Sequence, residues 1–434
     1  MMRIQQESHY ETSASRSFFL FLTILTGLSA LIYEVIWQRY LANLLGSHSQ
    51  ATATVLAVFL GGLSLGYALF GRISSNKSPQ VLTRVLGWAE VGIGVWALGF
   101  PELYLFLRNQ SGFIDPTSAA LLDGFYGVIL IGVPTVLMGG TIPLLTQALA
   151  TSVPDSQRLH AQLYTLNTAG AFVGCLIAGF YLIPMFGLPL ALYFGALINL
   201  VAGFALIAVS PRLPATLHHG PPRDTFQAAK HNNQELSPKR SVVIALLAGF
   251  YSITLQTVFI RIAGLSMGAS EYTFAMVVSI FIFMLALGAS LLTRKTSRTT
   301  LFGNQLLLFF STLALHQTIP YWPSMVHKIR VLFTPLPASF YLYHLVLFLA
   351  LTAILAIPIG CMGRTLPLLF SYSPLTFERL GKYVGVIYSS NTLGCVLGAY
   401  LGGFILLYHL NLDELFQLSL FLIMCNAVLV LPQK

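Results

Sequence analysis

Two carboxyl groups inside long apolar runs are the residues of this sequence best suited to chemistry. Glu34 lies between Tyr33 and Val35, about halfway along its run, and Glu90 lies two residues after Trp88. A charge at the centre of a membrane helix costs roughly 2.5–3.5 kcal/mol on insertion scales, so each carboxyl needs compensation. One interpretation is a proton or cation site facing a substrate path. The other is a structural hydrogen bond to a neighbouring helix.

Basic residues inside the apolar runs are equally few. Arg364 lies between Pro358 and Pro367. Its position favours either an anion-facing or gate-pairing group, or a side chain that extends to the cytoplasmic interface. Arg39 and Arg261 lie toward the outer ends of their runs, where a long side chain reaches the headgroups at little cost. We interpret these two arginines as membrane anchors.

Four prolines lie in two matching apolar runs. Pro134, Pro143, Pro358 and Pro367 are expected to kink or terminate helices and to release backbone carbonyls. Such carbonyls can bind cations, but kinks also serve gating or packing alone. We therefore treat the four prolines as gating or kink positions.

Amide side chains and glycines mark a second pair of runs. Asn167 and Asn391 are each followed by Thr, and they are predicted either to line a substrate path or to form interhelical hydrogen bonds. Gly394, Gly398 and Gly402 recur at every fourth residue. This spacing predicts close approach of two helices.

The sequence gives little support for catalysis, metal binding or a cofactor. It contains no H-E-x-x-H and no G-x-G-x-x-G. Its four cysteines show no C-x-x-C spacing, so neither a zinc site nor a disulfide framework is indicated. We predict no catalytic residue, no metal ligand and no cofactor.

Composition excludes an ordinary soluble protein. Of the 434 residues, 56% are apolar and 9% are charged, and the mean hydropathy is +0.77, whereas soluble domains average about 25% charged residues. The net charge of +9 comes from Lys and Arg in short gaps between apolar runs. That distribution is a topology signal and does not predict nucleic-acid binding. The principal partner is the lipid bilayer.

Apolar runs of about 20 residues predict about twelve transmembrane helices in an all-α polytopic protein. The predicted spans are 17–42, 50–72, 83–107, 118–149, 160–184, 187–209, 241–266, 271–293, 300–319, 339–370, 382–407 and 412–432. The chain then divides into a cytoplasmic tail (1–16), a first six-helix half (17–209), a cytoplasmic linker (210–240) and a second half (241–432). The gap at 320–337 suits a helix or loop at the membrane interface.

The distribution of basic residues predicts the orientation. With a cytoplasmic N-terminus and twelve helices, 17 Lys and Arg residues lie on the cytoplasmic side. The opposite side holds only Arg108, Lys328 and Arg330. This excess follows the positive-inside rule. Both termini are predicted to be cytoplasmic.

The two halves are related in sequence. A shift of 222 residues places Gly27 on Gly249 and Glu34 on Gln256. A shift of 224 places P-T-V-L-M-G-G-T-I-P-L-L, beginning at Pro134, on P-I-G-C-M-G-R-T-L-P-L-L, beginning at Pro358. Arg364 therefore replaces Gly140. Six helices per repeat give both halves one orientation, which is the arrangement of major-facilitator transporters.

Three segments resemble a known family. S-A-L-I-Y-E-V-I-W-Q-R-Y-L-A-N-L-L-G-S, M-G-G-T-I-P-L-L and L-Y-T-L-N-T-A-G-A-F-V-G are similar to the membrane portion of bacterial fused major-facilitator/spermidine synthase proteins. The resemblance spans roughly residues 17–431 and implies the membrane module and its fold. Members of that family often carry a soluble aminopropyltransferase-like domain after the membrane part, and no such segment follows here before Lys434.

These observations favour a secondary transporter of the bacterial cytoplasmic membrane that moves a small metabolite by alternating access. Its candidate substrate or coupling-ion residues are Glu34, Glu90, Gln256, Asn167, Asn391 and Arg364. An amine or polyamine substrate is implied only by the resemblance. The alternative is a membrane scaffold for a separately encoded soluble enzyme, an aminopropyltransferase-like partner on the cytoplasmic side.

Overall fold

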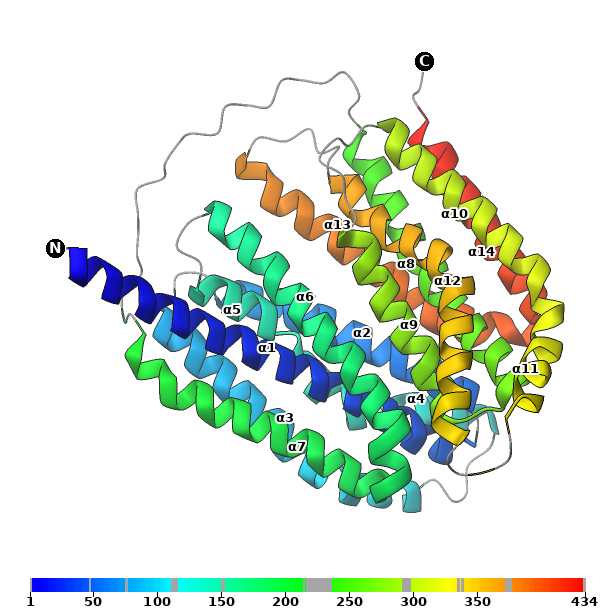
Figure 1. Ribbon diagram of the computed structural model, residues 1–434, viewed down its shortest axis with the longest axis horizontal. Coiled ribbons are helices and arrows are strands. Elements are labelled where there is room, and N and C mark those ends of the chain that lie inside the picture. Colours follow the sequence, from blue (N-terminus) through cyan, green and yellow to red (C-terminus); the bar gives the residue numbers. More distant parts are fainter. Residues whose placement is uncertain are drawn as a thin grey trace. The chain divides into compact units, whose positions relative to one another are not determined.

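All regular secondary structure in the described part of the chain is helical (Figure 1). The computed structural model describes residues 2–46, 48–74, 77–110, 116–149, 153–213, 215, 236–290, 298–333, 336, 339–370 and 377–431. The predicted linker (210–240) therefore lies mainly outside the described residues.

The helices match the predicted spans closely. The first seven are α1 (Met2–Leu45), α2 (His48–Ile73), α3 (Pro79–Gln110), α4 (Pro116–Met138), α5 (Thr141–Leu149), α6 (Val153–Ile177) and α7 (Ile183–Val209). The next seven are α8 (Pro238–Met267), α9 (Glu271–Ser290), α10 (Arg298–Thr318), α11 (Trp322–Val331), α12 (Phe340–Phe370), α13 (Phe377–Leu397) and α14 (Leu412–Val430). Two π-helical segments, η1 (Ala178–Leu182) and η5 (Gly398–Gly402), follow α6 and α13.

Among the described residues, ten helical stretches are long and apolar enough to cross a bilayer. One of them, Gln162–Arg212, holds two predicted crossings, because Gly187 has a φ of 72° and interrupts the helix. Glycine adopts this left-handed conformation without a steric penalty. The protein is therefore a multi-pass membrane protein.

Several helix boundaries differ from the sequence-based prediction. α1 begins at Met2, so the predicted tail (1–16) continues the first helix. The predicted span 118–149 is broken, because α4 ends at Met138 and α5 begins at Thr141. Phe70 packs closely at this break, because a Cβ atom at Gly140 would lie 2.8 Å from its ring. In the second half, α12 is continuous through the matching segment.

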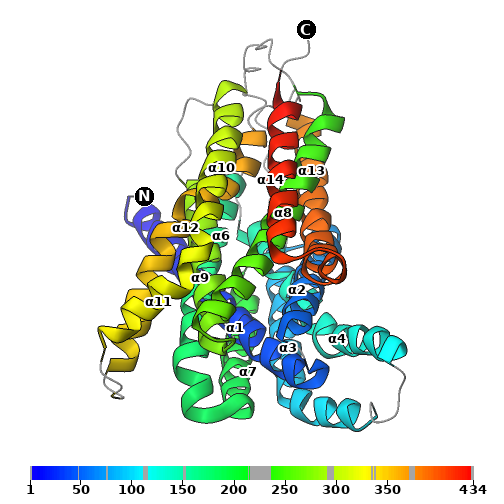
Figure 2. The ribbon, with the colours of Figure 1, turned by 90° about the vertical axis from the view of Figure 1, so that its right-hand side faces the viewer.

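Chain contacts divide the protein into two compact units, Met1–Leu44 with Val58–Asp224 and Leu45–Ala57 with Thr225–Lys434. In the first unit, α3 packs against α7, α4 and α5 (Figure 1). In the second unit, α8 packs against α13 and α14, and α14 against α10 (Figure 2). Each unit has its own aromatic core.

Those cores contain the largest buried side chains. In the first unit, Trp37 stacks on Tyr33 and on Phe100, at ring-centroid distances of 5.3 and 6.1 Å. In the second unit, Phe259 stacks on Trp322 at 6.4 Å. Trp322, in the segment 320–337 that the sequence assigns to the membrane interface, is 2% exposed and packs in this core.

Glycines pack helix backbones together in the same way in both units. A Cβ atom at Gly27 of α1 would overlap the Asn167 carbonyl of α6, and one at Gly249 of α8 would overlap the Asn391 carbonyl of α13. Gly394 and Gly398 also contact α8 through its backbone carbonyls, which confirms the close approach predicted from their spacing.

Candidate functional site

Glu90 lies in a buried polar cluster in the first unit. Its carboxylate accepts a hydrogen bond from the Asn199 amide at 2.5 Å and one from the Thr141 hydroxyl at 3.2 Å. The Asn199 oxygen in turn accepts a bond from the Tyr33 hydroxyl at 2.9 Å. These residues come from α3, α7, α5 and α1, and Glu90 is 1% exposed. The cluster therefore joins four helices around one carboxyl group.

A related cluster in the second unit is built around an amide. Thr365, the repeat counterpart of Thr141, accepts hydrogen bonds from Gln305 at 3.1 Å and from Asn304 at 3.3 Å. The Tyr251 hydroxyl donates to the Gln305 oxygen at 3.5 Å. Gln305 is fully buried on α10. Since Glu90 and Gln305 both contact the matching threonine from the third transmembrane helix of a half, they occupy equivalent places.

Glu34 and Gln256 form a second acid–amide pair. Glu34 is 4% exposed and Gln256 is 5% exposed. Within the described part of the chain, neither side chain has a hydrogen-bond partner. Each lies seven residues after a packing glycine, Gly27 or Gly249, and so on the helix face that meets α6 or α13. In both acid–amide pairs, Glu90 with Gln305 and Glu34 with Gln256, the carboxyl lies in the first unit.

The register of the packed helices directs this face toward the π-helical segments. On α8, Leu246, Phe250 and Thr254 contact Gly394, Gly398 and Gly402, which is a constant step of four residues on both helices. On α1, the same step begins with Ile24 on Gly170. Continued along α1, it brings Glu34 level with η1. π-Helical turns are rare and are frequent at functional sites.

In the second unit, side chains of α8 satisfy carbonyls at this segment. The Thr254 hydroxyl donates to the Gly398 carbonyl at 3.3 Å. Arg261 donates through Nη2 to the Gly403 carbonyl at 3.1 Å, while its Nε is buried without a partner among the described residues. Arg261 is therefore held by the protein and is not simply a membrane anchor.

The structure places three other sequence candidates as follows. Asn391 donates to the Ala245 carbonyl of α8 at 3.0 Å, so its side chain forms the interhelical bond that was one of its two predicted uses. Asn167 is half-buried, and its carbonyl lies against Gly27. Arg364 is half-buried on α12, and its Nε has no hydrogen-bond partner in the described part of the chain.

The four prolines all lie within helices. Pro134 is inside α4 and Pro143 is near the start of α5, on either side of the break at Gly139 and Gly140. Pro358 and Pro367 are inside α12. The break falls at Gly139 and Gly140, four and three residues before Pro143, where a proline disrupts a helix.

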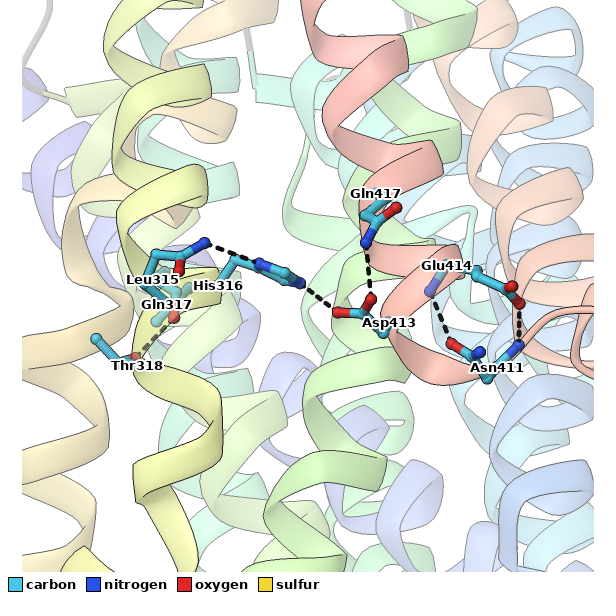
Figure 3. A network of polar contacts seen from close by, with 8 residues as sticks. All are labelled: Leu315, His316, Gln317, Thr318, Asn411, Asp413, Glu414 and Gln417. Atoms are coloured by element: carbon cyan, nitrogen blue, oxygen red, sulfur yellow. Dashed lines mark hydrogen bonds and ion pairs between the residues drawn. The ribbon is translucent and has the colours of Figure 1, made fainter.

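A third polar network lies at the ends of α10 and α14 (Figure 3). The His316 Nε2 atom lies 2.5 Å from the Asp413 carboxylate, which also accepts a bond from Gln417 at 2.7 Å. Asn411 and Glu414 form a reciprocal N-terminal cap on α14. Asp413 is 59% exposed at its side chain. An exposed pair of this kind contributes little to stability, and we assign the network to helix pairing and capping.

Two further features carry no chemistry. The segment G-L-S-L-G at 62–66 has the form of a nucleophile elbow, but it lies inside α2, and Gly62 and Gly66 pack against α4. An apolar groove of about 460 Å³ lies on α3 on the face opposite Glu90, lined by Trp88, Val91, Gly92, Val95, Trp96, Gly99 and Leu103. Among the described residues, no group of three His, Cys, Asp or Glu side chains is placed to hold a metal ion.

The sequence singled out Glu34, Glu90 and Gln256 but missed the partners of Glu90 and the related cluster around Gln305. Asn199, Thr141 and Gln305 are ordinary polar residues in apolar runs, and Asn199 lies 109 positions from Glu90. The repeat offered one signal, since Thr141 and Thr365 both stand in the matching proline motif.

Comparison with solved structures identifies the fold. A bacterial homologue of the iron transporter ferroportin in its inward-facing state is similar with a TM-score of 0.58 and 14% identity, covering 96% of this chain and 97% of that one. The POT family transporter PepTSo is similar with a TM-score of 0.61 and 12% identity, covering 96% of both chains. A structure described as a bacterial metal transporter gives 0.56 and 14%, covering 96% and 97%.

The fold is major-facilitator-like. The predicted all-α polytopic class is confirmed; about twelve membrane helices were predicted, and the fold has about 10–12. No family model matches the sequence, and no curated protein matches it. The resemblance to the spermidine synthase-like family thus rests on the sequence motifs alone.

Proposed function

We propose that this protein is a secondary transporter that moves a small metabolite by alternating access, with proton or cation coupling at Glu34 and Glu90. The observation that carries the proposal is the acid–amide asymmetry of a duplicated scaffold. Both buried carboxyls, Glu34 and Glu90, lie in the first unit, and their counterparts Gln256 and Gln305 are amides.

An amide can serve as the buried hydrogen-bonding group at these positions without carrying a charge. Gln305 bonds to its threonine from the same place as Glu90, so a buried hydrogen-bond network at this position does not require an acid. A buried carboxylate is more costly than a buried amide because its charge is desolvated. The acids supply what an amide lacks, which is the reversible gain and loss of a proton or a cation.

The substrate class comes from two separate likenesses. The sequence motifs resemble a family named for spermidine synthase, which favours an amine or polyamine. Solved structures of similar fold are described as iron, metal and peptide transporters. We propose amines first, divalent cations and small peptides next, and a bacterial cytoplasmic membrane location with both termini cytoplasmic.

The first experiment measures uptake of labelled amines, divalent cations and dipeptides into proteoliposomes, with and without a pH gradient. We expect gradient-driven accumulation by the wild type and its loss in Glu34→Gln, because the amide cannot release a proton. Glu102→Gln is the matched control, since Glu102 is an exposed glutamate of α3. It should keep wild-type accumulation.

Two results would count against the proposal. If Glu34→Gln accumulates substrate with unchanged pH dependence, Glu34 has no coupling role. If folded wild-type protein takes up none of the three substrate classes, the scaffold alternative gains weight. Co-purification of a soluble aminopropyltransferase-like protein would then be the next measurement.

A further inference from the structure

The matching threonines of the two units donate their hydroxyl protons in different directions. Thr365 donates to the Cys361 carbonyl, four residues earlier on its own helix, at 3.0 Å. It can do so because Gln305 approaches it as a donor. Thr141 instead donates to the Glu90 carboxylate. An ionised carboxylate only accepts hydrogen bonds, so the hydroxyl must turn toward it.

The backbone differs at the same place. Around Thr365 the helix α12 is continuous. Just before Thr141 the helix is interrupted between α4 and α5. There the Gly140 amide donates to the Leu137 carbonyl, three residues earlier, at 3.0 Å. Leu137 is the repeat counterpart of Cys361. Its carbonyl is therefore the acceptor that Thr141 would use if it behaved as Thr365 does.

Glutamine resembles a protonated glutamic acid, since each carries an acceptor oxygen and a donor group at the same two positions, the donor being NH₂ in one and O–H in the other. When the Glu90 carboxylate takes a proton from water, its new O–H group can donate to the Thr141 oxygen, as Gln305 does to Thr365. The Thr141 hydroxyl proton is then free for the Leu137 carbonyl. Asn199 continues to donate to the other carboxyl oxygen.

We propose that Glu90 binds a coupling proton and that the α4–α5 junction responds to it, through Thr141, by becoming a continuous helix like α12. This inference rests on the proposed transport function and identifies the proton as its coupling ion at this site. Tyr33 from α1, through Asn199, is the one other titratable group in the hydrogen-bonded cluster described. Thr141 from α5 and Asn199 from α7 complete the cluster and carry no charge.

The test is amide hydrogen exchange of the full-length protein, comparing peptides that cover 136–149 at acidic and neutral pH after correction for the intrinsic exchange rate. We expect wild-type protection at the junction to rise about fivefold in acid, the effect of roughly one added hydrogen bond. Glu90→Gln should show the acidic level at both pH values. Thr141→Val should abolish the response, and Thr141→Ser should restore it.

Two further variants sharpen the result. Gln305→Glu should give the 358–370 segment of α12 a pH-dependent protection that the wild type lacks. Glu102→Gln, on the same helix as Glu90, should respond like the wild type. The proposal is overturned if Glu90→Gln and wild type show the same pH response at 136–149. The readout needs no substrate, so this outcome would leave the proposed transport function standing, and failed uptake would leave this result interpretable.

Discussion

Asn199 holds the Glu90 cluster together because its side chain donates to the carboxylate and accepts from Tyr33. Asn199 and Glu90 are both 1% exposed, so water cannot easily replace a lost partner. Leaving a buried acceptor unsatisfied costs about 1–3 kcal/mol, more when it is charged. The amide therefore contributes to stability as well as to the orientation of the carboxyl.

Asn199→Ala should lower the free energy of unfolding by about 1–3 kcal/mol at neutral pH. The loss should shrink in acid, where Glu90 is protonated and no longer a buried charge. Thermal unfolding in detergent at two pH values measures both effects. In a Glu90→Leu background the same substitution should cost less, which a double-mutant cycle reports as coupling.

Asn426→Ala is the matched control for that cycle. Asn426 is a fully buried asparagine of α14 whose amide donates to the neutral Ile244 carbonyl at 3.1 Å. Its loss should cost about 0.5–1.5 kcal/mol and should not vary with pH. Equal costs for Asn199→Ala and Asn426→Ala at neutral pH would contradict a charged Glu90.

At the residue scale the sequence singled out the buried acids but not the residues that they contact. Glu34 and Glu90 stand out because acids are rare in apolar runs, and this needs no knowledge of the fold. The partners of Glu90 could not be predicted, because Thr141 and Asn199 meet it only after helices distant in sequence pack together. The roles of Glu34, Gln256 and Arg364 remain predictions for the transport assay.

Helix packing in both units depends on glycines that bring backbones into contact. Gly363 and Gly360 lie on one helix, α12, yet differ in their surroundings. A Cβ atom at Gly363 would overlap the Leu285 carbonyl of α9, whereas one at Gly360 meets nothing within 4 Å. The same substitution at the two positions therefore separates packing from helix propensity.

Gly363→Ala should destabilise the protein by about 1–3 kcal/mol through overpacking. Gly360→Ala should be neutral or stabilising by up to about 1 kcal/mol, because alanine favours helix more than glycine does. Thermal unfolding of the two variants side by side checks this. Comparable losses at both positions would show that the α9–α12 contact is not tight.

Hydropathy predicted the helices well and their interruptions poorly. Apolar length is a property of the sequence alone, so spans such as 241–266 agree closely with α8. The break before Thr141 could not be predicted from the prolines alone, because α12 carries prolines at the matching positions and is continuous. Pro143 nonetheless marks the place, since a proline removes the backbone hydrogen bond to the residue four positions earlier, which is Gly139.

At the scale of the whole molecule, the excess of basic residues in alternate loops predicts one orientation in the membrane. The prediction is tested with Arg330→Cys and Lys239→Cys, two exposed positions expected on opposite sides. A membrane-impermeant thiol reagent should label Arg330→Cys in intact cells, and Lys239→Cys only after the membrane is opened. The wild type is the control, since Cys175 and Cys361 are buried and Cys395 and Cys425 are half-buried.

Labelling of Lys239→Cys in intact cells, with Arg330→Cys protected, would reverse the orientation. Such a result would also place the surface expected to bind a soluble enzyme partner on the opposite side of the membrane. The duplicated architecture itself was predictable because the repeat leaves matching motifs in the sequence. The substrate could not be predicted, because substrate choice depends on a few side chains and not on the scaffold that both halves share.

The duplicated glycine contacts also limit how the molecule can deform. Where two helices touch backbone to backbone, as α1 does with α6 and α8 with α13, no flexible side chain lies between them to absorb a displacement. We expect each such pair to move as one rigid body, so the protein has fewer independently moving parts than it has helices. A force applied to one member of a pair is transmitted directly to the other. Bending is then expected outside the two pairs, at the Gly139–Gly140 break and at the Gly187 turn.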